Sequence, residues 1–314
     1  AMVRARLPEG TVAKARESGY CNVCDGKSVA AVLPLFAGLS FFATPWGAWC
    51  ILVAANFCGG YFVDAELVRE RPVLSALLCT AVTATWSVCS FIPFARFHDG
   101  LYRDNPDLRC QGNKEHDVSL FNRVEVRLAA SSLCLAALQT TLVVFGKVLY
   151  GWGWFYFDVA DYGWAYLFLS AVMYFVWIDI WAYFAHRLLH LPFLYRTVHK
   201  WHHMFKQPTA FVGLALHPVD MLLIQGGVMA GLYIMPLHVS VIAVNLLYAH
   251  YYNVVDHSGV YHESVLPWQP SSLYHDDHHK FFHLNYGQFL TVWDRMCGTF
   301  YQNDKKYTES TFSY

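Results

Sequence analysis

The chain has 314 residues, of which 56% are hydrophobic, 17% aromatic and only 14% charged, and its formal net charge at pH 7 is −1. This composition is too apolar for an ordinary soluble domain of that length, and it indicates a protein that lives in a bilayer. The near-zero net charge argues against nucleic acid as a partner.

Several apolar stretches have the length that a helix needs to cross the hydrocarbon core of a membrane. They are residues 46–63, 73–95, 130–150, 164–184, 219–235 and 237–255, the last two forming a tight hairpin around Pro236. A further apolar stretch, 29–44, is interrupted by Pro34 and followed by Pro45. Because of these prolines, we expect it to be interfacial or re-entrant. A span there would place the N-terminus in the lumen.

The lysines and arginines alternate between rich and poor connections. The N-terminal arm carries five and the segment 96–127 carries six, whereas 64–72 carries two and 151–163 none. Since cytoplasmic loops carry the excess of positive charge, both termini and the 96–127 loop are predicted to face the cytosol. The predicted fold class is all-α: a polytopic membrane helical bundle of about six spans, with a cytosolic histidine-rich helical cap.

Nine of the sixteen histidines lie close together in the second half of the chain. They are His186 and His190; His199, His202 and His203; His257; and His275, His278 and His279. Residues spaced i, i+3 and i+4 lie on one face of a helix, so the imidazoles of each group can converge on one point. The pattern predicts a metal site. The isolated histidines are not expected to be ligands: His98, His116, His238, His262 and His283.

The predicted site is dinuclear, because nine imidazoles exceed what one ion can hold. Neutral imidazole suits zinc, iron, copper and nickel. At the end of an aromatic-rich bundle, oxygen activation by a di-iron centre fits better than di-zinc hydrolysis, which usually has bridging carboxylates. A metal transporter is a distant alternative, but its ligands would lie near the membrane midplane. A haem-binding electron carrier would need facing histidine pairs on opposing spans.

Other residues are candidates beside the nine. Asp179 lies two helical turns before His186 on the same face, so we expect its carboxylate to accept a hydrogen bond from a ligating imidazole, with a helix-to-helix hydrogen bond as the alternative. Asp256 is expected either to support His257 or to cap a helix. Candidates for an additional coordination position, or for holding a water there, are His217, His250 and Asn253.

Five segments carry a family resemblance. They are His-Arg-Leu-Leu-His at 186–190, His-Lys-Trp-His-His at 199–203, His-Pro-Val-Asp at 217–220, His-Asp-Asp-His-His at 275–279 and the run from Asn285 to Thr299. Together they resemble the fatty acid hydroxylase superfamily over residues 175–303. Within it, the last segment and Pro-Thr-Ala-Phe at 208–211 most resemble the sterol delta-5 desaturases, the lathosterol oxidase group.

The resemblance implies an endoplasmic-reticulum enzyme with two Fe ions, zinc being the alternative in purified protein, and with O2 as co-substrate. It implies the nine grouped histidines as ligands, a lipid substrate from the bilayer, and electrons from cytochrome b5 and NADH-cytochrome b5 reductase. The chain has no glycine-rich dinucleotide fingerprint, so its electrons must come from another protein. The basic residues Arg187, Arg196, Lys200 and Lys206 form a candidate docking rim for that donor.

Two departures bear on the substrate. Leu191 stands where these desaturases usually have a histidine, and 255–259 looks more like the corresponding segment of sphingoid-base hydroxylases. The expected reaction is sterol delta-5 desaturation, with hydroxylation of a sphingoid base, a fatty acyl chain or another sterol position as the alternative. We divide the chain into a cytosolic or interfacial segment, a transmembrane region, a fatty acid hydroxylase-like catalytic domain and a tail, at 1–45, 46–160, 161–303 and 304–314.

Overall fold

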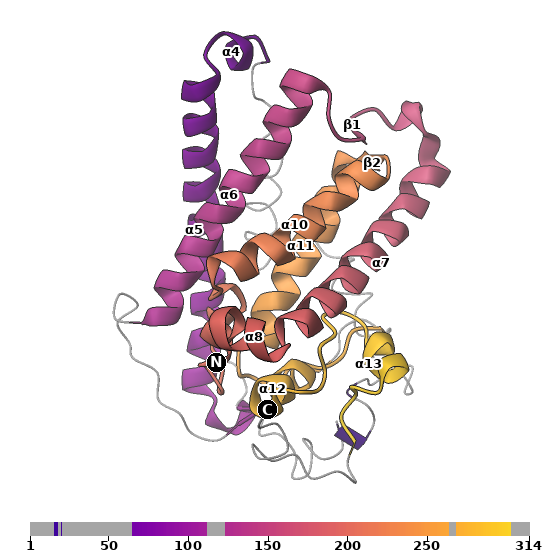
Figure 1. Cartoon of the computed structure of the whole chain (residues 1–314). Coiled ribbons are helices and arrows are strands. Elements are labelled where there is room, and N and C mark those ends of the chain that lie inside the picture. The colour runs from indigo at the N-terminus through magenta and orange to yellow at the C-terminus, as the bar shows by residue number, and fades with distance from the viewer. Residues whose placement is uncertain (1–15, 18–19, 21–64, 112–122, 264–267, 303–314) are drawn as a thin grey trace.

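The computed structural model describes residues 16–17, 20, 65–111, 123–263 and 268–302. Most of these residues are helical (Figure 1). The predicted span 46–63, the segment 29–44 and the tail 304–314 lie outside the described residues. The division into domains therefore stays a prediction.

The helices run along one bundle, with short elements at its two ends (Figure 1). The α-helices are α4 Ala65–Glu70, α5 Pro72–Asp104, α6 Val124–Tyr150, α7 Gly163–Leu189, α8 Pro192–Leu194, α9 Lys200–His203, α10 Pro218–Ile234, α11 Val239–Asp256, α12 Leu273–Phe281 and α13 Val292–Cys297. Short 3-10 turns are η3 Pro106–Leu108, η5 Val159–Asp161 and η7 Val212–Leu214, and η6 Tyr195–His199 is a π-helical turn. The strands are β1 Phe155–Tyr156 and β2 Leu237–His238.

Within the described residues, three helices are long and apolar enough to cross a membrane, judged by length and composition: α5, α6 and α7. Helix α10 is apolar but has only 17 residues. Helices thus coincide with the five predicted spans from 73–95 onward, which confirms a mostly helical protein with apolar membrane-length helices. Whether α10 and α11, the latter with 18 residues, cross completely stays a prediction.

Helices α7 and α10 approach closely because α10 carries glycine where α7 carries tryptophan. A Cβ atom on Gly227 would come within 1.8 Å of the Trp181 ring. The Nε1 atoms of Trp177 and Trp181 donate to the carbonyls of Gly227 and Leu223, at 2.9 and 3.1 Å. The indole hydrogen bonds and the missing side chain together fix the spacing of the two helices, as small residues do in membrane bundles.

At the end of the bundle away from α12, the two strands tie the connections together. Phe155 pairs with Leu237 and Tyr156 with His238 in a parallel register. The side chain of His238 caps α11 by accepting from the Ser240 amide, and its Nε2 lies 2.8 Å from the carbonyl oxygen of Phe157. This histidine therefore has a structural position far from the grouped histidines, as the sequence predicts.

Candidate metal centre

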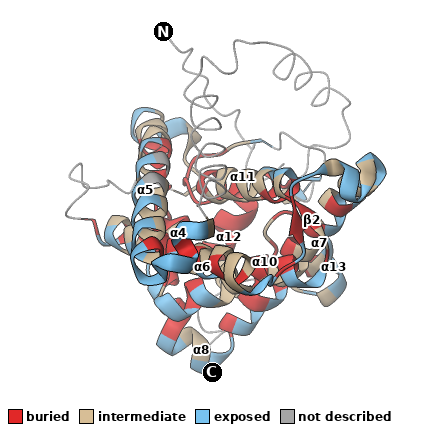
Figure 2. Ribbon diagram, turned by 90° about the horizontal axis from the view of Figure 1, so that it is seen from above, coloured by how far each residue is buried: buried red, intermediate tan, exposed pale blue. Residues whose placement is uncertain are grey.

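The other end of the bundle carries the nine grouped histidines on five elements. His186 lies in the last turn of α7, and His190 caps that helix. The π-helical turn η6 and α9 present His199, His202 and His203, while His257 caps α11. The last three lie on α12, whose residues from Leu273 to His279 are all buried, as Figure 2 shows.

The structure brings all nine imidazoles together and divides them into two groups. The five-histidine group is His186, His190, His199, His203 and His278, and the four-histidine group is His202, His257, His275 and His279. Within each group the nitrogens that could bind an ion lie within 4.8 Å of one another. Each group draws on at least three of the five elements, so neither can assemble before these elements pack together.

Nitrogens face nitrogens across each group. The Nε2 atom of His203 lies 3.1 Å from those of His190 and His278. In the other group, the Nε2 atom of His257 lies 3.0 Å from that of His275 and 3.4 Å from that of His202. All nine side chains are buried, none more than 8% exposed. Lone pairs that converge in a buried space are what a nitrogen-ligated transition metal requires.

Oxygen acceptors hold the opposite nitrogen of five rings. The Nδ1–H groups of His186, His278 and His279 donate to the carbonyls of Tyr286, Leu284 and Phe205, at 3.0, 2.6 and 3.2 Å. Those of His199 and His257 donate to carboxylates, described below. Such bonds fix the tautomer and aim Nε2 at the centre. The Nε2 atoms of His186, His199 and His279 are buried without a protein partner among the described residues, so the donor set fits bound metal ions.

Burial lowers the pKa of several of these rings. It holds the pKa of His202, His203, His275 and His278 well below the usual value, with the neighbouring imidazoles lowering it further. An imidazole must be deprotonated to bind a metal. The cap therefore supplies its nitrogens in the form that ligation needs.

Each group has one carboxylate behind it. An oxygen of Asp220 lies 2.6 Å from Nδ1 of His199, and an oxygen of Asp256 lies 2.6 Å from Nδ1 of His257, with all four side chains buried. The amide of Gln288 donates to the other oxygen of Asp256 at 2.7 Å. Asp256 thus supports His257, one of its two predicted roles. The motif at 217–220 contains Asp220, but the sequence did not predict its role, because its partner His199 lies 21 residues away.

Asp179 does not hold an imidazole, contrary to the expectation. Its carboxylate accepts from the amides of Phe289 and Leu290 at 2.9 and 3.2 Å and from Nε1 of Trp293 at 2.6 Å. The side chain is fully buried in α7 and faces the segment from Asn285 to Thr299. Two turns of helix separate it from His186, so it reaches the neighbouring segment instead.

Asp294 lies within that same segment and holds it together by hydrogen bonds. It accepts from the amides of Tyr286 and Gly287, at 2.9 and 2.7 Å, and from the hydroxyl of Thr299 at 2.7 Å. These bonds present the Tyr286 carbonyl to His186. The family resemblance pointed to this segment, but the role of Asp294 was not predicted. The signal in the sequence was an acidic side chain within an apolar run.

The three additional ligand candidates stand apart from the two groups. His217 caps α10, where its Nδ1 accepts from the Val219 amide at 3.2 Å, so it is not a member of either group. His250 packs against Phe91, with ring centroids 5.5 Å apart. Asn253 gives its backbone carbonyl, not its side chain, to Nδ1 of His257 at 2.8 Å. Leu191 is exposed at the start of α8, so the missing histidine removes no member of a group.

The helix that carries the last histidines is tied to the N-terminal arm. Nε of Arg16 and the hydroxyl of Tyr20 donate to Asp277 at 2.7 and 2.8 Å. Asp277 is completely buried and belongs to neither histidine group. Arg16 and Tyr20 therefore hold α12 through Asp277.

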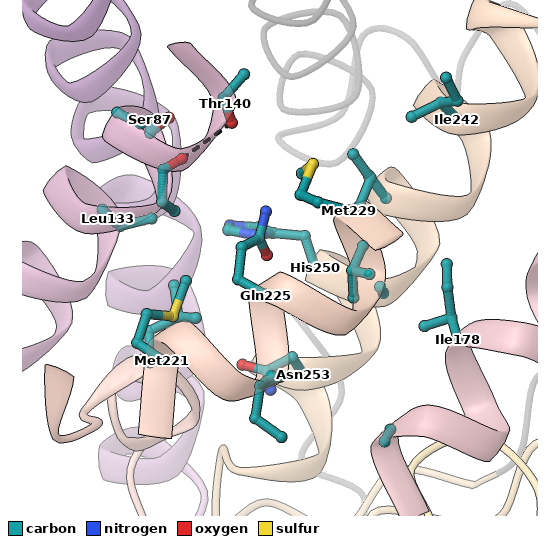
Figure 3. Close-up of a pocket in the computed structure, with 18 of the residues that line it drawn as sticks. Ser87, Leu133, Thr140, Ile178, Met221, Gln225, Met229, Ile242, His250 and Asn253 are labelled. Atoms are coloured by element: carbon teal, nitrogen blue, oxygen red, sulfur yellow. Dashed lines mark hydrogen bonds between the residues drawn. The ribbon is translucent and has the colours of Figure 1, made fainter. Parts of the chain in front are cut away.

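A cavity of about 300 Å³ lies inside the bundle beside the histidines. Helices α6, α7, α10 and α11 line it, mostly with apolar side chains. Figure 3 shows Met221, Met229, Ile178 and Ile242 around it, and its polar members there are Gln225, His250, Asn253, Ser87 and Thr140. Its lining residues Ala182 and Asn253 each precede a grouped histidine by one helical turn. The cavity therefore ends beside the metal centre.

Comparison with known proteins agrees with this geometry. Residues 171–299 match the family described as fatty acid hydroxylase. This match confirms the predicted family resemblance. Lathosterol oxidase from Mus musculus is 33% identical over 192 residues, which are 59% of this chain and 64% of that protein. The delta(7)-sterol 5(6)-desaturase of Saccharomyces cerevisiae is 31% identical over 199 residues, 60% of this chain and 54% of that protein.

The chain thus spans less than two thirds of the length of the curated relatives it matches first. The predicted resemblance to sterol desaturases is confirmed by these relatives and by lathosterol oxidase from Homo sapiens, which is 31% identical over 192 residues, 59% of this chain and 64% of that protein. No solved structure is detectably similar to the chain. The matched segment contains all nine grouped histidines together with Asp179, Asp220, Asp256 and Asp294.

Proposed function

We propose that this protein is a membrane-bound di-iron oxidoreductase that desaturates a sterol at the delta-5 position. The observation that carries the proposal is the division of nine buried imidazoles into groups of five and four beside a mostly apolar cavity. The family match and the sterol-oxidising relatives support the reaction class and the substrate class.

The two groups would each hold one ion through the imidazole nitrogens. Iron is proposed as the native metal and O2 as the co-substrate, because a site with two irons bound supplies the chemistry that breaks unactivated C–H bonds. Zinc competes for nitrogen sites and is the expected contaminant of purified protein. Asp220 and Asp256 orient one ligand in each group and raise its basicity.

The chain's own residues decide what reacts. The cavity binds the apolar body of the lipid and places one edge of it beside the histidines, while the close packing of the cap excludes water from the site. Desaturation removes two hydrogens from adjacent carbons of the lipid. Together with O2, two electrons and two protons, these hydrogens leave as two molecules of water, so the reaction needs an outside electron donor.

Cytochrome b5 and its NADH-dependent reductase are the proposed donors. Arg187, Arg196, Lys200 and Lys206 are all exposed around the histidine cap. A basic rim of this kind would steer an acidic donor to the site. We also propose location in the endoplasmic reticulum, six spans and a cytosolic cap, since the positive charge of the connections favours that orientation.

Expression in yeast that lacks its own sterol delta-5 desaturase tests the proposal. Gas chromatography with mass spectrometry of the sterols is expected to show the 5,7-diene. The matched control is His202→Ala, which removes one ligand and is expected to leave only the delta-7 sterol. Delta-7 sterol accumulating in cells that contain folded, metal-loaded wild-type protein would contradict the proposal, and rescue of a sphingoid-hydroxylase deletion strain would replace it by the alternative reaction.

A further inference from the structure

The end of the cavity that adjoins the metal centre carries a carboxamide. Asn253 lines the cavity from α11, one helical turn before His257. A rise of 1.5 Å per residue puts it about 6 Å from the level of that histidine. Farther along the helices, Phe155, Leu232 and Ile242 line the cavity with apolar side chains, and the hydroxyl residues Thr83, Ser87 and Thr140 line it from α5 and α6. A bound lipid would therefore meet a carboxamide at the end beside the metal centre.

The carboxamide of Asn253 makes no hydrogen bond to the described residues. Its Oδ1 atom is buried without a partner. The backbone oxygen of the same residue is the atom that His257 uses, so the side chain is not needed to position the metal ligand. An unsatisfied amide in an apolar cavity is costly, so a ligand group that forms a hydrogen bond with it gains free energy of binding.

The chain makes room for this amide. Gly213, in η7, faces Asn253 so closely that a Cβ atom there would lie 2.1 Å from Oδ1 and 2.7 Å from the Asn253 carbonyl. Gln288 adds a second polar group at the same end: its Nε2 is bonded to Asp256, which leaves its Oε1 as an acceptor. Both amides belong to the cavity wall and neither belongs to a histidine group.

The length of the cavity fits an elongated lipid lying along the helices. It is lined on α10 from Met221 to Leu232 and on α11 from Ile242 to Asn253. Eleven residues of helix extend about 16 Å. A sterol in a bilayer keeps its hydroxyl at the interface and its ring system in the hydrocarbon, so it could occupy this cavity hydroxyl-first without inverting.

We propose that the Asn253 carboxamide, assisted by Gln288, binds the hydroxyl group of the lipid substrate and thereby places the carbons nearest to that hydroxyl beside the metal centre. A hydroxyl both donates and accepts, so it satisfies the amide in either orientation of its oxygen and nitrogen. The inference rests on the proposed sterol desaturation. It deepens that proposal by assigning the group that fixes how the sterol lies and which carbon reacts.

The test compares a delta-7 sterol that carries the 3-hydroxyl with its 3-deoxy analogue. The full-length, metal-loaded wild type is expected to prefer the hydroxyl compound by roughly tenfold to a hundredfold in kcat/KM, because the analogue leaves the amide unsatisfied. Asn253→Leu is expected to lose most of this preference by converting the hydroxyl compound poorly. Asn253→Ala is the second variant, should leucine fit badly against Gly213.

Binding without turnover supplies an independent readout. A fluorescent polyene sterol excited through Trp181, which lines the cavity, reports the dissociation constant. We expect both Asn253 variants to bind it about tenfold more weakly than wild type, with unchanged metal content. The matched control is Gln225→Leu, which removes an amide farther along the same cavity and is expected to keep the wild-type preference.

The outcomes separate this inference from the proposed function. If wild type converts the sterol but the Asn253 variants keep its full preference and affinity, the inference is wrong and the function stands. Loss of preference in Gln225→Leu alone would move the hydroxyl site away from the metal end and also overturn it. If wild type neither binds nor converts any sterol, both proposals fall.

Discussion

The two carboxylates behind the histidines allow the two metal groups to be perturbed one at a time. Asp220 is bonded to His199 of the five-histidine group, and Asp256 to His257 of the four-histidine group. We predict that Asp220→Asn weakens metal binding mainly in the first group and that Asp256→Asn weakens it mainly in the second. Asparagine keeps the size of the side chain and removes its negative charge.

The expected magnitude follows from the geometry. Each bond is 2.6 Å long and lies between side chains that are at most 3% exposed, so solvent screens it little. Hydrogen bonds to charged groups contribute about 1.5–3 kcal/mol. Loss of such a partner typically lowers metal affinity about 10- to 100-fold, or about 1.4–2.7 kcal/mol at 1.36 kcal/mol per factor of ten. The two independent scales agree.

Competition with a chelator of known affinity measures the effect. Purified protein is titrated with the chelator, and elemental analysis follows the metal that remains bound per chain. Each variant is expected to release one ion at a chelator concentration about 10- to 100-fold lower than wild type does, and the second ion as wild type does.

Asp276→Asn is the matched control. Asp276 is buried on α12 between grouped histidines, yet among the described residues no imidazole donates to it. Its substitution is expected to leave both release steps unchanged. Release of both ions together from Asp220→Asn and Asp256→Asn would contradict separate roles for the two carboxylates. So would release from both variants that does not differ from the control.

Three further predictions concern the metals, the topology and the donor. Purified protein is expected to carry about two transition-metal ions per chain by elemental analysis, and His202→Ala about one; a single ion in wild type would contradict the division into groups. In sealed microsomes, protease is expected to reach tags at both termini, whereas a protected N-terminus would mean that 29–44 spans. Turnover with cytochrome b5 and its reductase is expected to fall as ionic strength rises. At low salt, Lys200→Glu is expected to turn over more slowly than wild type. Turnover that does not change with salt would exclude the basic rim as the docking site.

Helical spacing predicted which histidines gather but not what surrounds them. A spacing of three or four residues fixes a face within one helix, and this local rule located eight of the nine members of the two groups. His257 stands alone in the sequence, and its place between the other groups and the family resemblance pointed to it. Asp179 shows the limit of the rule: its face was predicted correctly, but its partners lie more than a hundred residues away, at Phe289, Leu290 and Trp293. Such contacts depend on how segments pack, which periodicity does not encode.

The same limit explains His250 and Asn253. Both share a helix face with His257, so the sequence allowed them a place at the metals. Along α11, however, they lie about 10 and 6 Å from the level of His257, since each residue advances the helix 1.5 Å. A shared face brings these three side chains to the same side of the bundle. Because of the axial rise, His257 reaches the histidine groups, whereas His250 and Asn253 line the cavity.

One short segment links the two metal groups to the cavity. The carbonyl of Tyr286 holds His186 of the five-histidine group, and Gln288 holds Asp256 behind the four-histidine group. Phe289, next in the chain, lines the cavity and is anchored by Asp179. Because four consecutive residues touch all three features, a change that shifts this segment, such as Asp179→Ala, must disturb both groups and the substrate position together. Asp220 and Asp256 each act on one ligand, whereas Asp179 acts on the frame that fixes the metals relative to the lipid.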